Sequence, residues 1–389
     1  MKFWTRKMGS ATVIILMVMG LGSCKDAPVA SSTYSPNEFT LLLATSNEGE
    51  VGPCGWKSRP LGGLARKHTI LKSLEETQAT YFVDAGDAFF KNAYVAATKK
   101  DILEGTARAI LQSYNSMNCQ LLNVGSKDLA NGLAFIQELQ QAANFPFISA
   151  NISLAGNSDL LFAPSAIIET HDMKLGFVGV STGNSRVKDF KFSDPVLAAQ
   201  KAIEQIKSQV DLVILLANVD DPTERELLSK VEGVDFLIRS QTARRYQKPK
   251  LENNIVVIRN GNQGKYAGVL QVKIDKLDGP LKDISAQQKR IKFADNRLNA
   301  MRTNIEEGVS LEQHYAGDEK RLELITRLRS ERADNVNLIS KLSNTYYFDP
   351  IALDEKIADT PEVAEIVREF MVDHTVVKED VRKAKPTKG

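Results

Sequence analysis

The chain has 389 residues, a length that predicts two folded units, with room for a third, at about 150 residues per domain. Hydrophobic residues make up 43% and charged residues 25%, which excludes a wholly disordered chain and a protein with many membrane spans. The 50 Lys and Arg residues against 48 Asp and Glu residues give a net charge of +2, too balanced for a dedicated nucleic-acid-binding protein.

The N-terminus has the features of an export signal. Lys2, Arg6 and Lys7 precede an apolar run over residues 11–21, which is too short to cross a bilayer core of about 30 Å as a helix. The run ends in Leu21-Gly22-Ser23-Cys24, which resembles the lipobox of bacterial lipoproteins. An ordinary signal peptide with an incidental Cys24 is the alternative.

The lipobox resemblance implies that residues 1–23 are removed and that Cys24 carries a lipid anchor in the membrane. Lys25 follows Cys24, in place of an Asp that would favour retention in the inner membrane. The expected location is therefore the cell envelope, on the outer membrane and facing the periplasm. Residues 24–38 are rich in Ser and Pro and are predicted to be a tether.

From Phe39 onward, short apolar runs alternate with longer amphipathic stretches. Strands are predicted at 39–45, 80–84, 120–124, 146–150, 174–180, 211–217, 234–239, 255–259 and 268–274. Helices are predicted at 63–76, 99–117, 129–143, 195–209 and 222–231. Continuous apolar runs such as residues 212–216 are typical of strands covered on both faces. Residues 39–280 are therefore predicted to form an α/β domain with two packed sheets, whose ligands lie beyond the carboxyl ends of the strands.

The C-terminal third predicts a helical hairpin and a closing segment. Residues 281–343 form an antiparallel coiled-coil hairpin, with apolar seams at Ile284, Ile291, Leu298, Ile305, Ile325, Leu328, Ile339 and Leu342. This hairpin is either a structural arm or a surface for a protein partner. Residues 344–373 are predicted as a strand and a helix that close onto the core, and residues 374–389 as a basic tail.

Six segments, in this order, resemble the motifs of the 5′-nucleotidase-type calcineurin-like metallophosphoesterases. They are residues 52–55, 61–66, Asp84-Ala85-Gly86-Asp87, 123–129, 234–238 and 260–266. The resemblance covers residues 39–275 and extends to 353–370. It implies a layered, metallophosphoesterase-like β-sandwich flanked by helices. It also implies hydrolysis of nucleotide phosphate esters at two divalent metals about 3.5–4 Å apart.

The residues at the implied metal-ligand positions depart from the family's pattern. The segment that corresponds to the family's Asp-x-His motif contains Asn47 instead. The family's Asn-His pair is replaced by Ser126 and Lys127, which precede Asp128. Two later His motifs are replaced by segments that contain Asn218 and Gln241. Only Asp87, which matches the bridging carboxylate, and Asp84 remain. The 4 His, at positions 68, 171, 314 and 374, lie elsewhere in the sequence.

The sequence therefore predicts a degenerate pocket without a metal or another cofactor, in which Lys127 places a positive charge where a cation would sit. Its residues are Asn47, Asp84, Asp87, Ser126, Lys127, Asp128, Asn218 and Gln241. The predicted function is binding or scaffolding without hydrolysis, with no nucleic-acid partner. The alternative is a residual phosphoesterase or nucleotidase that holds Mn²⁺ or Zn²⁺ on Asp84 and Asp87.

Two further groups of residues have two interpretations each. Cys54 and Cys119 form either a disulfide, which an exported chain permits, or two free thiols. A basic cluster after the strand at 234–239 is either an anion-binding lip at the rim of the pocket or a solvated loop. Its members are Arg239, Arg244, Arg245, Lys248 and Lys250.

Overall fold

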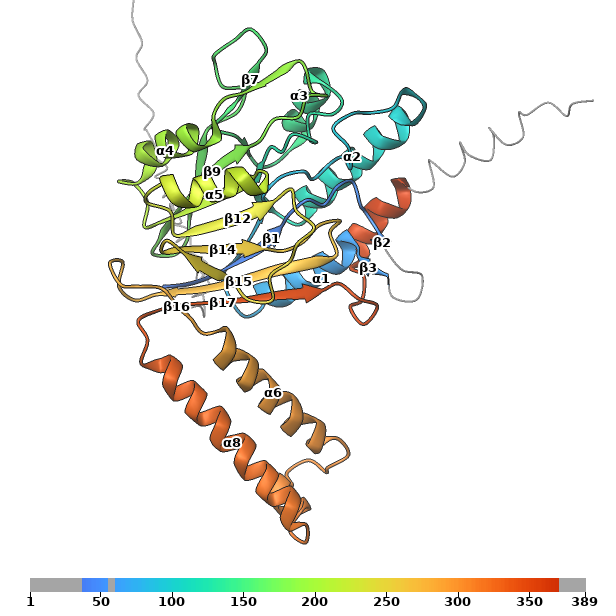
Figure 1. The fold of residues 1–389 in the computed structure, drawn as a ribbon. Coiled ribbons are helices and arrows are strands. Elements are labelled where there is room, and N and C mark those ends of the chain that lie inside the picture. Colours follow the sequence, from blue (N-terminus) through green and yellow to red (C-terminus); the bar gives the residue numbers. More distant parts are fainter. Residues whose placement is uncertain (1–36, 55–59, 371–389) are drawn as a thin grey trace, which may run out of the picture. The chain divides into compact units, whose positions relative to one another are not determined.

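The computed structural model describes residues 37–54 and 60–370, which belong to one compact unit, Tyr34–Gly389 (Figure 1). The predicted signal peptide, Cys24, nearly all of the tether and the basic tail lie outside the described residues. None of the helices in the described part of the chain has the length and apolar character needed to cross a membrane.

The first sheet has seven strands in the order β16-β17-β15-β1-β4-β5-β6. They are β1 (Glu38–Ala44), β4 (Thr80–Asp84), β5 (Cys119–Asn123), β6 (Phe147–Ile148), β15 (Tyr266–Ile274), β16 (Lys282–Asp283) and β17 (Asn344–Ala352). β1, β4, β5 and β6 run parallel, whereas β15 is antiparallel to both β1 and β17. The carboxyl ends of β1, β4 and β5 therefore meet at one edge.

The second sheet has six strands in the order β13-β14-β12-β11-β9-β8. They are β8 (Ser165–Glu169), β9 (Lys174–Ser181), β11 (Leu212–Asn218), β12 (Phe236–Ser240), β13 (Lys250–Glu252) and β14 (Ile255–Arg259). The four inner strands run parallel, and β8 and β13 are antiparallel at the edges. All seven residues of β11 are buried, as expected for a strand covered on both faces.

The two sheets pack face to face, and helices cover their outer faces (Figure 1). Because side chains alternate along a strand, Leu41 and Leu43 of β1 pack between the sheets while Leu42 packs toward the helices. α1 (Leu64–Glu75), α2 (Lys100–Ser116) and α3 (Leu133–Ala142) cover the first sheet, and α4 (Pro195–Ile206) and α5 (Asp221–Lys230) cover the second. The predicted layered α/β architecture is confirmed.

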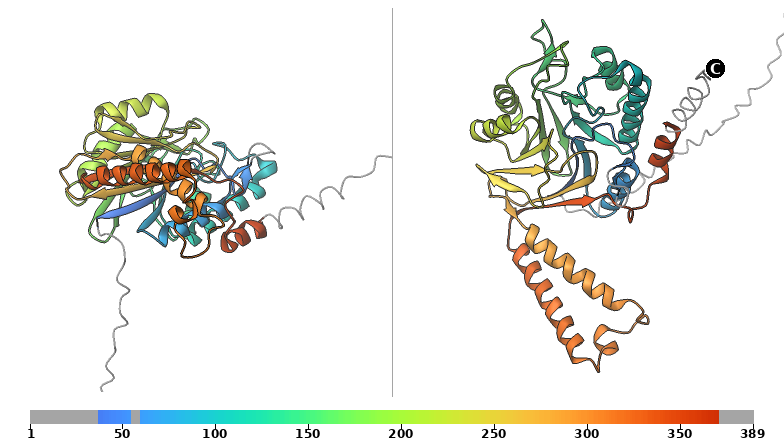
Figure 2. Two further views of the ribbon diagram at one scale, coloured as in Figure 1. Left: turned by 90° about the horizontal axis from the view of Figure 1, so that it is seen from below. Right: turned by 45° about the vertical axis from the view of Figure 1, so that its right-hand side comes forward.

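A helical hairpin is inserted between β16 and β17. α6 (Ser285–Arg302) and α8 (Glu319–Ser340) lie side by side, with the short α7 (Leu311–His314) between them in the sequence (Figure 2). Ala294, Ile325 and Leu328 are buried in the seam. Arg332 Nε donates to Asp295 Oδ1 at 2.7 Å and links the two helices of the hairpin.

The C-terminal segment packs against α1. Residues 361–370 are helical, and Val363 is fully buried in the core under the first sheet's helices. Thr360, just before this helix, hydrogen-bonds through Oγ1 to His68 Nδ1 at 3.0 Å. His68 therefore has a structural position on α1.

The structure contains several short elements that the sequence did not predict, and its helix α3 begins later than predicted. The strands β2 (Pro53–Cys54), β3 (Leu61–Gly62), β7 (Ile152–Leu154) and β10 (Phe190–Phe192), and the 3₁₀ helix η1 (Ala97–Lys99), are too short to produce a periodic pattern. α3 begins at Leu133 instead of residue 129, because residues 126–131 form turns and Gly132, at a positive φ of 82°, caps the helix.

Candidate functional site

The carboxyl ends of strands from both sheets converge on one buried polar cluster. Ser240 Oγ, at the end of β12, donates to the carbonyl of Ala85 at 2.6 Å, after β4. The Gln241 backbone N–H donates to Ser46 Oγ at 2.7 Å, after β1. All eight predicted pocket residues lie in this region, six of them buried and two, Lys127 and Gln241, partly exposed.

Lys127 lies between two carboxylates at the centre of the cluster. Its Nζ is 2.6 Å from Glu48 Oε1 and 3.6 Å from Asp87 Oδ2, and its backbone N–H donates to Asp87 Oδ1 at 3.1 Å. Burial opposes the charged form of the lysine, but the charges of Asp87 and Glu48 outweigh this effect, so the pKa of Lys127 is raised. Burial raises the pKa of Asp87, while Lys127 acts to lower it. We call Glu48, Asp87 and Lys127 the ammonium triad.

Glu48 is the member of the triad that the sequence prediction missed. It follows β1 with a positive φ of 56°, and its second carboxylate oxygen, Oε2, accepts from Asn262 Nδ2 at 3.0 Å. The sequence signal that could have identified Glu48 is its acidic side chain next to Asn47, in a segment that departs from the family pattern. Its pairing with Lys127 depends on the turn after β1, which sequence spacing does not define.

Asp128 organises the loops around the triad. Its two carboxylate oxygens accept backbone N–H groups of Asp87, Phe89 and Gly125, each at 2.9 Å. Burial and the nearby charge of Asp87 raise the pKa of Asp128 to about 8, although the three donors favour the ionised form. All of its partners are backbone groups, so Asp128 fixes loop geometry.

Asp84 faces away from the triad. Its Oδ1 accepts from the Gly86 N–H at 2.7 Å, and its Oδ2 accepts from the Tyr114 hydroxyl at 2.7 Å. Two charged groups act on its pKa: Lys67 of α1, which is 1% exposed, lowers it, and Asp87 raises it. Both oxygens of Asp84 are therefore engaged, one by the loop after β4 and the other by α2.

The remaining predicted residues contribute amide and hydroxyl oxygens. Asn218 Nδ2 donates to Ser240 Oγ at 2.8 Å, Asn47 Nδ2 donates to the Glu50 carbonyl at 2.8 Å, and Gln241 Oε1 accepts from Thr182 Oγ1 at 2.9 Å. No donor reaches Asn47 Oδ1 or Asn218 Oδ1, and the Ser126 hydroxyl has no hydrogen-bond partner among the described residues.

The close approach of Asp87 and Gly125 makes the cluster sensitive to one methyl group. A Cβ at Gly125 would lie 2.3 Å from Asp87 Oδ1 and 2.5 Å from the Asp87 backbone nitrogen. We expect Gly125→Ala to lower the free energy of unfolding by about 1–3 kcal/mol, as measured by urea denaturation. Gly52→Ala is the matched control, since no atom lies within 4 Å of its added Cβ. Equal stability of the two variants would contradict this packing.

The disulfide interpretation of the two cysteines is corrected by the structure. Cys54 and Cys119 are free thiols. Cys119 begins β5, at the opposite end of that strand from the cluster, where its Sγ contacts the Leu121 carbonyl at 3.4 Å. Cys54 Sγ contacts the Gln263 carbonyl at 3.7 Å, in the loop before β15. The two thiols therefore contact different carbonyl groups and form no disulfide with each other.

The structure contradicts the interpretation of Arg239 as part of an anion-binding lip. This residue is 1% exposed, and its guanidinium is 3.3 Å from Asp221 Oδ1 and 3.5 Å from Glu224 Oε2. Arg244 also pairs with Asp221 at 3.3 Å, and the Arg245 guanidinium stacks 4.1 Å from the centre of the Tyr266 ring. The three arginines of the cluster are therefore engaged with neighbouring side chains.

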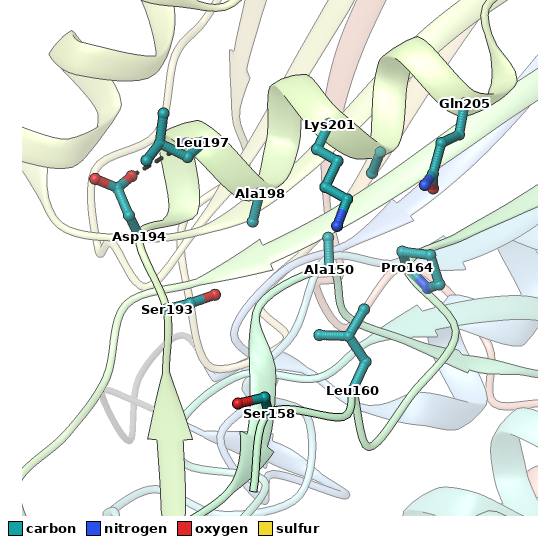
Figure 3. Close-up of a pocket in the computed structure, with 11 residues that line it drawn as sticks. Ala150, Ser158, Leu160, Pro164, Ser193, Asp194, Leu197, Ala198, Lys201 and Gln205 are labelled. Atoms are coloured by element: carbon teal, nitrogen blue, oxygen red, sulfur yellow. Dashed lines mark hydrogen bonds between the residues drawn. The ribbon is translucent and has the colours of Figure 1, made fainter.

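A separate groove of about 430 Å³ lies between α4 and residues 158–164 (Figure 3). Leu160, Leu197 and Pro164 line it with apolar surface, and Lys201 points into it. Leu197 is 71% exposed at its rim. None of the residues that line the groove belongs to the ammonium triad.

No protein-family model matches the chain, but curated relatives do. It is 24% identical over 265 residues to the trifunctional nucleotide phosphoesterase protein YfkN of Bacillus subtilis, a match covering 57% of this chain and 18% of that protein. It is 26% identical over 183 residues to a 2′,3′-cyclic-nucleotide 2′-phosphodiesterase/3′-nucleotidase of Haemophilus influenzae, covering 42% and 28%. The chain thus spans less than a third of either relative.

Solved structures establish the fold. The crystal structure of a 5′-nucleotidase precursor from Thermus thermophilus has a TM-score of 0.60 at 14% identity, covering 87% of this chain and 59% of that one. The crystal structure of the calcineurin-like phosphoesterase YfkN from Bacillus subtilis has a TM-score of 0.59 at 18% identity, covering 89% and 99%. The predicted metallophosphoesterase-like sandwich is confirmed.

The side chains of the cluster do not fit the two-metal centre that the resemblance implies. Such a centre needs several His and carboxylate ligands. Among residues 37–54 and 60–370, no group of three His, Cys, Asp or Glu side chains is arranged to hold a metal ion. The oxygens of Asp84 and Asp128 are already bonded to other groups, and the Lys127 ammonium lies beside Asp87.

Proposed function

We propose that this chain, which has the fold of the 5′-nucleotidase-type calcineurin-like phosphoesterases, is an exported lipoprotein that binds or scaffolds and does not hydrolyse. Its relatives are phosphoesterases and nucleotidases by name, so loss of hydrolysis is a property proposed for this chain alone. In this proposal the chain retains the fold of its relatives without their hydrolysis.

The position of the Lys127 ammonium is the observation that supports this proposal. It lies 3.6 Å from Asp87, the residue that matches the family's bridging carboxylate, and 2.6 Å from Glu48. A positive charge this close to the carboxylate repels a divalent cation, and burial strengthens the repulsion. The Lys127 ammonium also balances part of the negative charge of Asp87 and Glu48, so these carboxylates do not depend on a metal for charge balance.

A residual phosphoesterase with Mn²⁺ or Zn²⁺ is the second candidate. The acceptor oxygen of Asn218, which has no donor, favours it because a cation would satisfy that atom. Asp84 and Asp128, two of the carboxylates that it would need, instead have both oxygens engaged by N–H or hydroxyl groups. The binding or scaffold function is therefore the better supported of the two.

A hydrolysis assay separates the two candidates. Purified protein is incubated with nucleoside monophosphates, a 2′,3′-cyclic nucleotide and a generic phosphate ester, each with added Mn²⁺ or Zn²⁺. We expect no turnover above that of the Asp87→Asn variant. Turnover by the wild-type protein that Asp87→Asn abolishes would overturn the proposal and support the residual enzyme.

Lipid anchoring through Cys24 is tested by cell fractionation. We expect the wild-type protein in the membrane fraction, and Cys24→Ala outside it, because the acyl chains provide the membrane affinity. Cys54→Ala, which replaces a free thiol in the folded domain, should stay with the membrane. Equal membrane association of wild type and Cys24→Ala would contradict the anchor.

The hairpin is proposed as a contact surface for a protein partner. Phe293 on α6 and Leu338 on α8 are 64% and 52% exposed, so both helices of the hairpin offer apolar surface that a partner would bury. We expect Phe293→Glu with Leu338→Glu to abolish specific cross-links of the hairpin to another protein in cells. The exposed Leu197→Glu on α4 should leave them intact. Unchanged cross-links in the double variant would support a purely structural arm.

A further inference from the structure

The groove between α4 and residues 158–164 has the size and lining of a small-molecule site (Figure 3). Its volume of about 430 Å³ falls within the range of about 300–1,000 Å³ that is typical of ligand pockets. The buried side chains of Ala150 and Ala202 line its interior. Leu160 and Leu197, which are 44% and 71% exposed, add apolar surface that a ligand in the groove would bury.

Hydrogen bonds within the chain hold the two sides of the groove in place. On the side of the second sheet, the backbone N–H of Ala150 donates to the Gly179 carbonyl of β9 at 2.7 Å. At the start of α4, Asp194 Oδ1 accepts from the N–H groups of Val196 and Leu197 at 2.8 Å and 3.1 Å, which fixes the first turn of the helix. The site is therefore preformed, and binding would require little ordering of the chain.

Two polar side chains of α4 line the groove without a partner. Lys201 and Gln205 lie on one face of the helix because they are one turn apart, and Lys201 points into the groove (Figure 3). Among the described residues, neither the Lys201 ammonium nor the Gln205 side-chain amide has a hydrogen bond or an ion pair. The groove thus combines apolar surface with one unpaired positive charge and one neutral hydrogen-bond donor.

The carboxylate of Asp194 limits what the other end of the groove can accept. Asp194 also lines the groove and precedes Lys201 by two helical turns, which is about 10 Å along α4. A second negative group on a ligand would be repelled there. The two ends together favour a ligand with one negative group beside Lys201 and an apolar chain that runs toward Asp194.

We infer that this groove binds a medium-chain monocarboxylate. The carboxylate accepts hydrogen bonds from Lys201 Nζ and from the Gln205 amide, and the chain lies against Leu160 and Leu197. One ammonium balances a single negative charge, whereas a phosphate monoester carries about −1.5 to −2. The inference goes beyond the proposed function and does not rest on it, because none of the residues that line the groove belongs to the ammonium triad.

The test is calorimetric titration of the purified full chain with decanoate, kept below the concentration at which it forms micelles. We expect one decanoate to bind per chain. Lys201→Met, which removes the charge of the side chain, should weaken binding about tenfold, whereas Lys201→Arg should retain most of it. Leu197→Ser should also weaken binding, because it removes apolar contact. Lys207→Met, which removes an exposed lysine just beyond α4 and outside the groove, is the matched control and should bind as the wild type does.

Related probes test which feature of the ligand is recognised. Decanol and decylammonium lack the carboxylate, and decanedioate has a second one that meets Asp194. Each of the three should bind at least about tenfold more weakly than decanoate. Asp194→Asn, which keeps a helix-capping side chain, should raise the affinity for decanedioate more than that for decanoate.

Three results would overturn the inference: no binding of decanoate, equal binding of decanoate and decanol, or equal binding of decanoate to the wild type and Lys201→Met. A specific cross-link from residue 197 to another protein, without decanoate binding, would overturn it in favour of a protein partner at the groove. Each of these results leaves the proposed loss of hydrolysis unchanged, because that proposal is tested at Asp87.

Discussion

Replacing Glu224 by Gln is expected to lower the free energy of unfolding by about 3–5 kcal/mol, since it removes the shared counter-charge of two buried arginines. Glu224 is 3% exposed, and its carboxylate accepts from Arg259 through both oxygens and lies 3.5 Å from Arg239. Burial disfavours the charged form of Arg239 and lowers its pKa, while Glu224 opposes that effect. The neutral variant leaves the two guanidinium groups with the half-exposed Asp221 as their main partner.

Urea denaturation measures this effect, with Glu226→Gln as the matched control on the same helix. Glu226 pairs with Lys230 at 2.8 Å on the solvent side of α5, where ion pairs contribute little. The control variant should therefore unfold close to the wild-type midpoint. If Glu224→Gln also unfolds there, the buried cluster does not stabilise the carboxyl end of the second sheet.

Lys67 is expected to make the stability of the fold rise with pH in alkaline solution. Burial lowers the pKa of Lys67 from 10.5 to about 8 in the folded protein, and the nearby Asp84 only partly opposes this. Between these two values the unfolded chain binds a proton that the folded chain does not. Raising the pH through this range therefore favours the folded state by about 3 kcal/mol, and below about pH 8 the cost of burying the ammonium is fully present.

The comparison that isolates this effect is the free energy of unfolding of wild type and Lys67→Met across the same pH range. The wild-type curve should rise relative to that of Lys67→Met, because the other alkaline groups, such as Tyr114 and Cys119, are present in both proteins. Lys201→Met removes an exposed lysine and should keep the wild-type slope. Parallel curves for wild type and Lys67→Met would show that Lys67 stays protonated or reaches water.

Much of the fold could be predicted because its main strands are continuous apolar runs. Residues 212–216 are buried on both faces of β11, and the predicted strands at 80–84 and 255–259 match β4 and β14 to the residue. The location of the candidate site followed from the rule that loops after parallel strands share one edge. That rule brought together Asp87, Lys127 and Asn218 from three distant segments.

The partners of the site residues could not be predicted, because they depend on turn geometry. Glu48 contacts Lys127 from a turn in which Ser46 and Glu48 both have positive φ. Positive φ favours glycine, so the residue types in this turn do not predict its conformation. The sequence predicts Arg239 at the rim because it ends the apolar run at 234–239, but Glu224 and Asp221 of α5 draw it into a buried cluster. Such long-range charge pairing leaves no local pattern.

We propose that the Lys127 ammonium occupies the place of a metal centre on a retained phosphoesterase fold. The metal content of the purified wild-type protein, after equilibration with Mn²⁺ and Zn²⁺ and removal of free ions, tests it most directly. We predict no bound metal above the amount found with a protein that lacks metal sites. Two ions per chain, lost together in Asp87→Asn, would contradict the claim, since that stoichiometry is the signature of a two-metal centre.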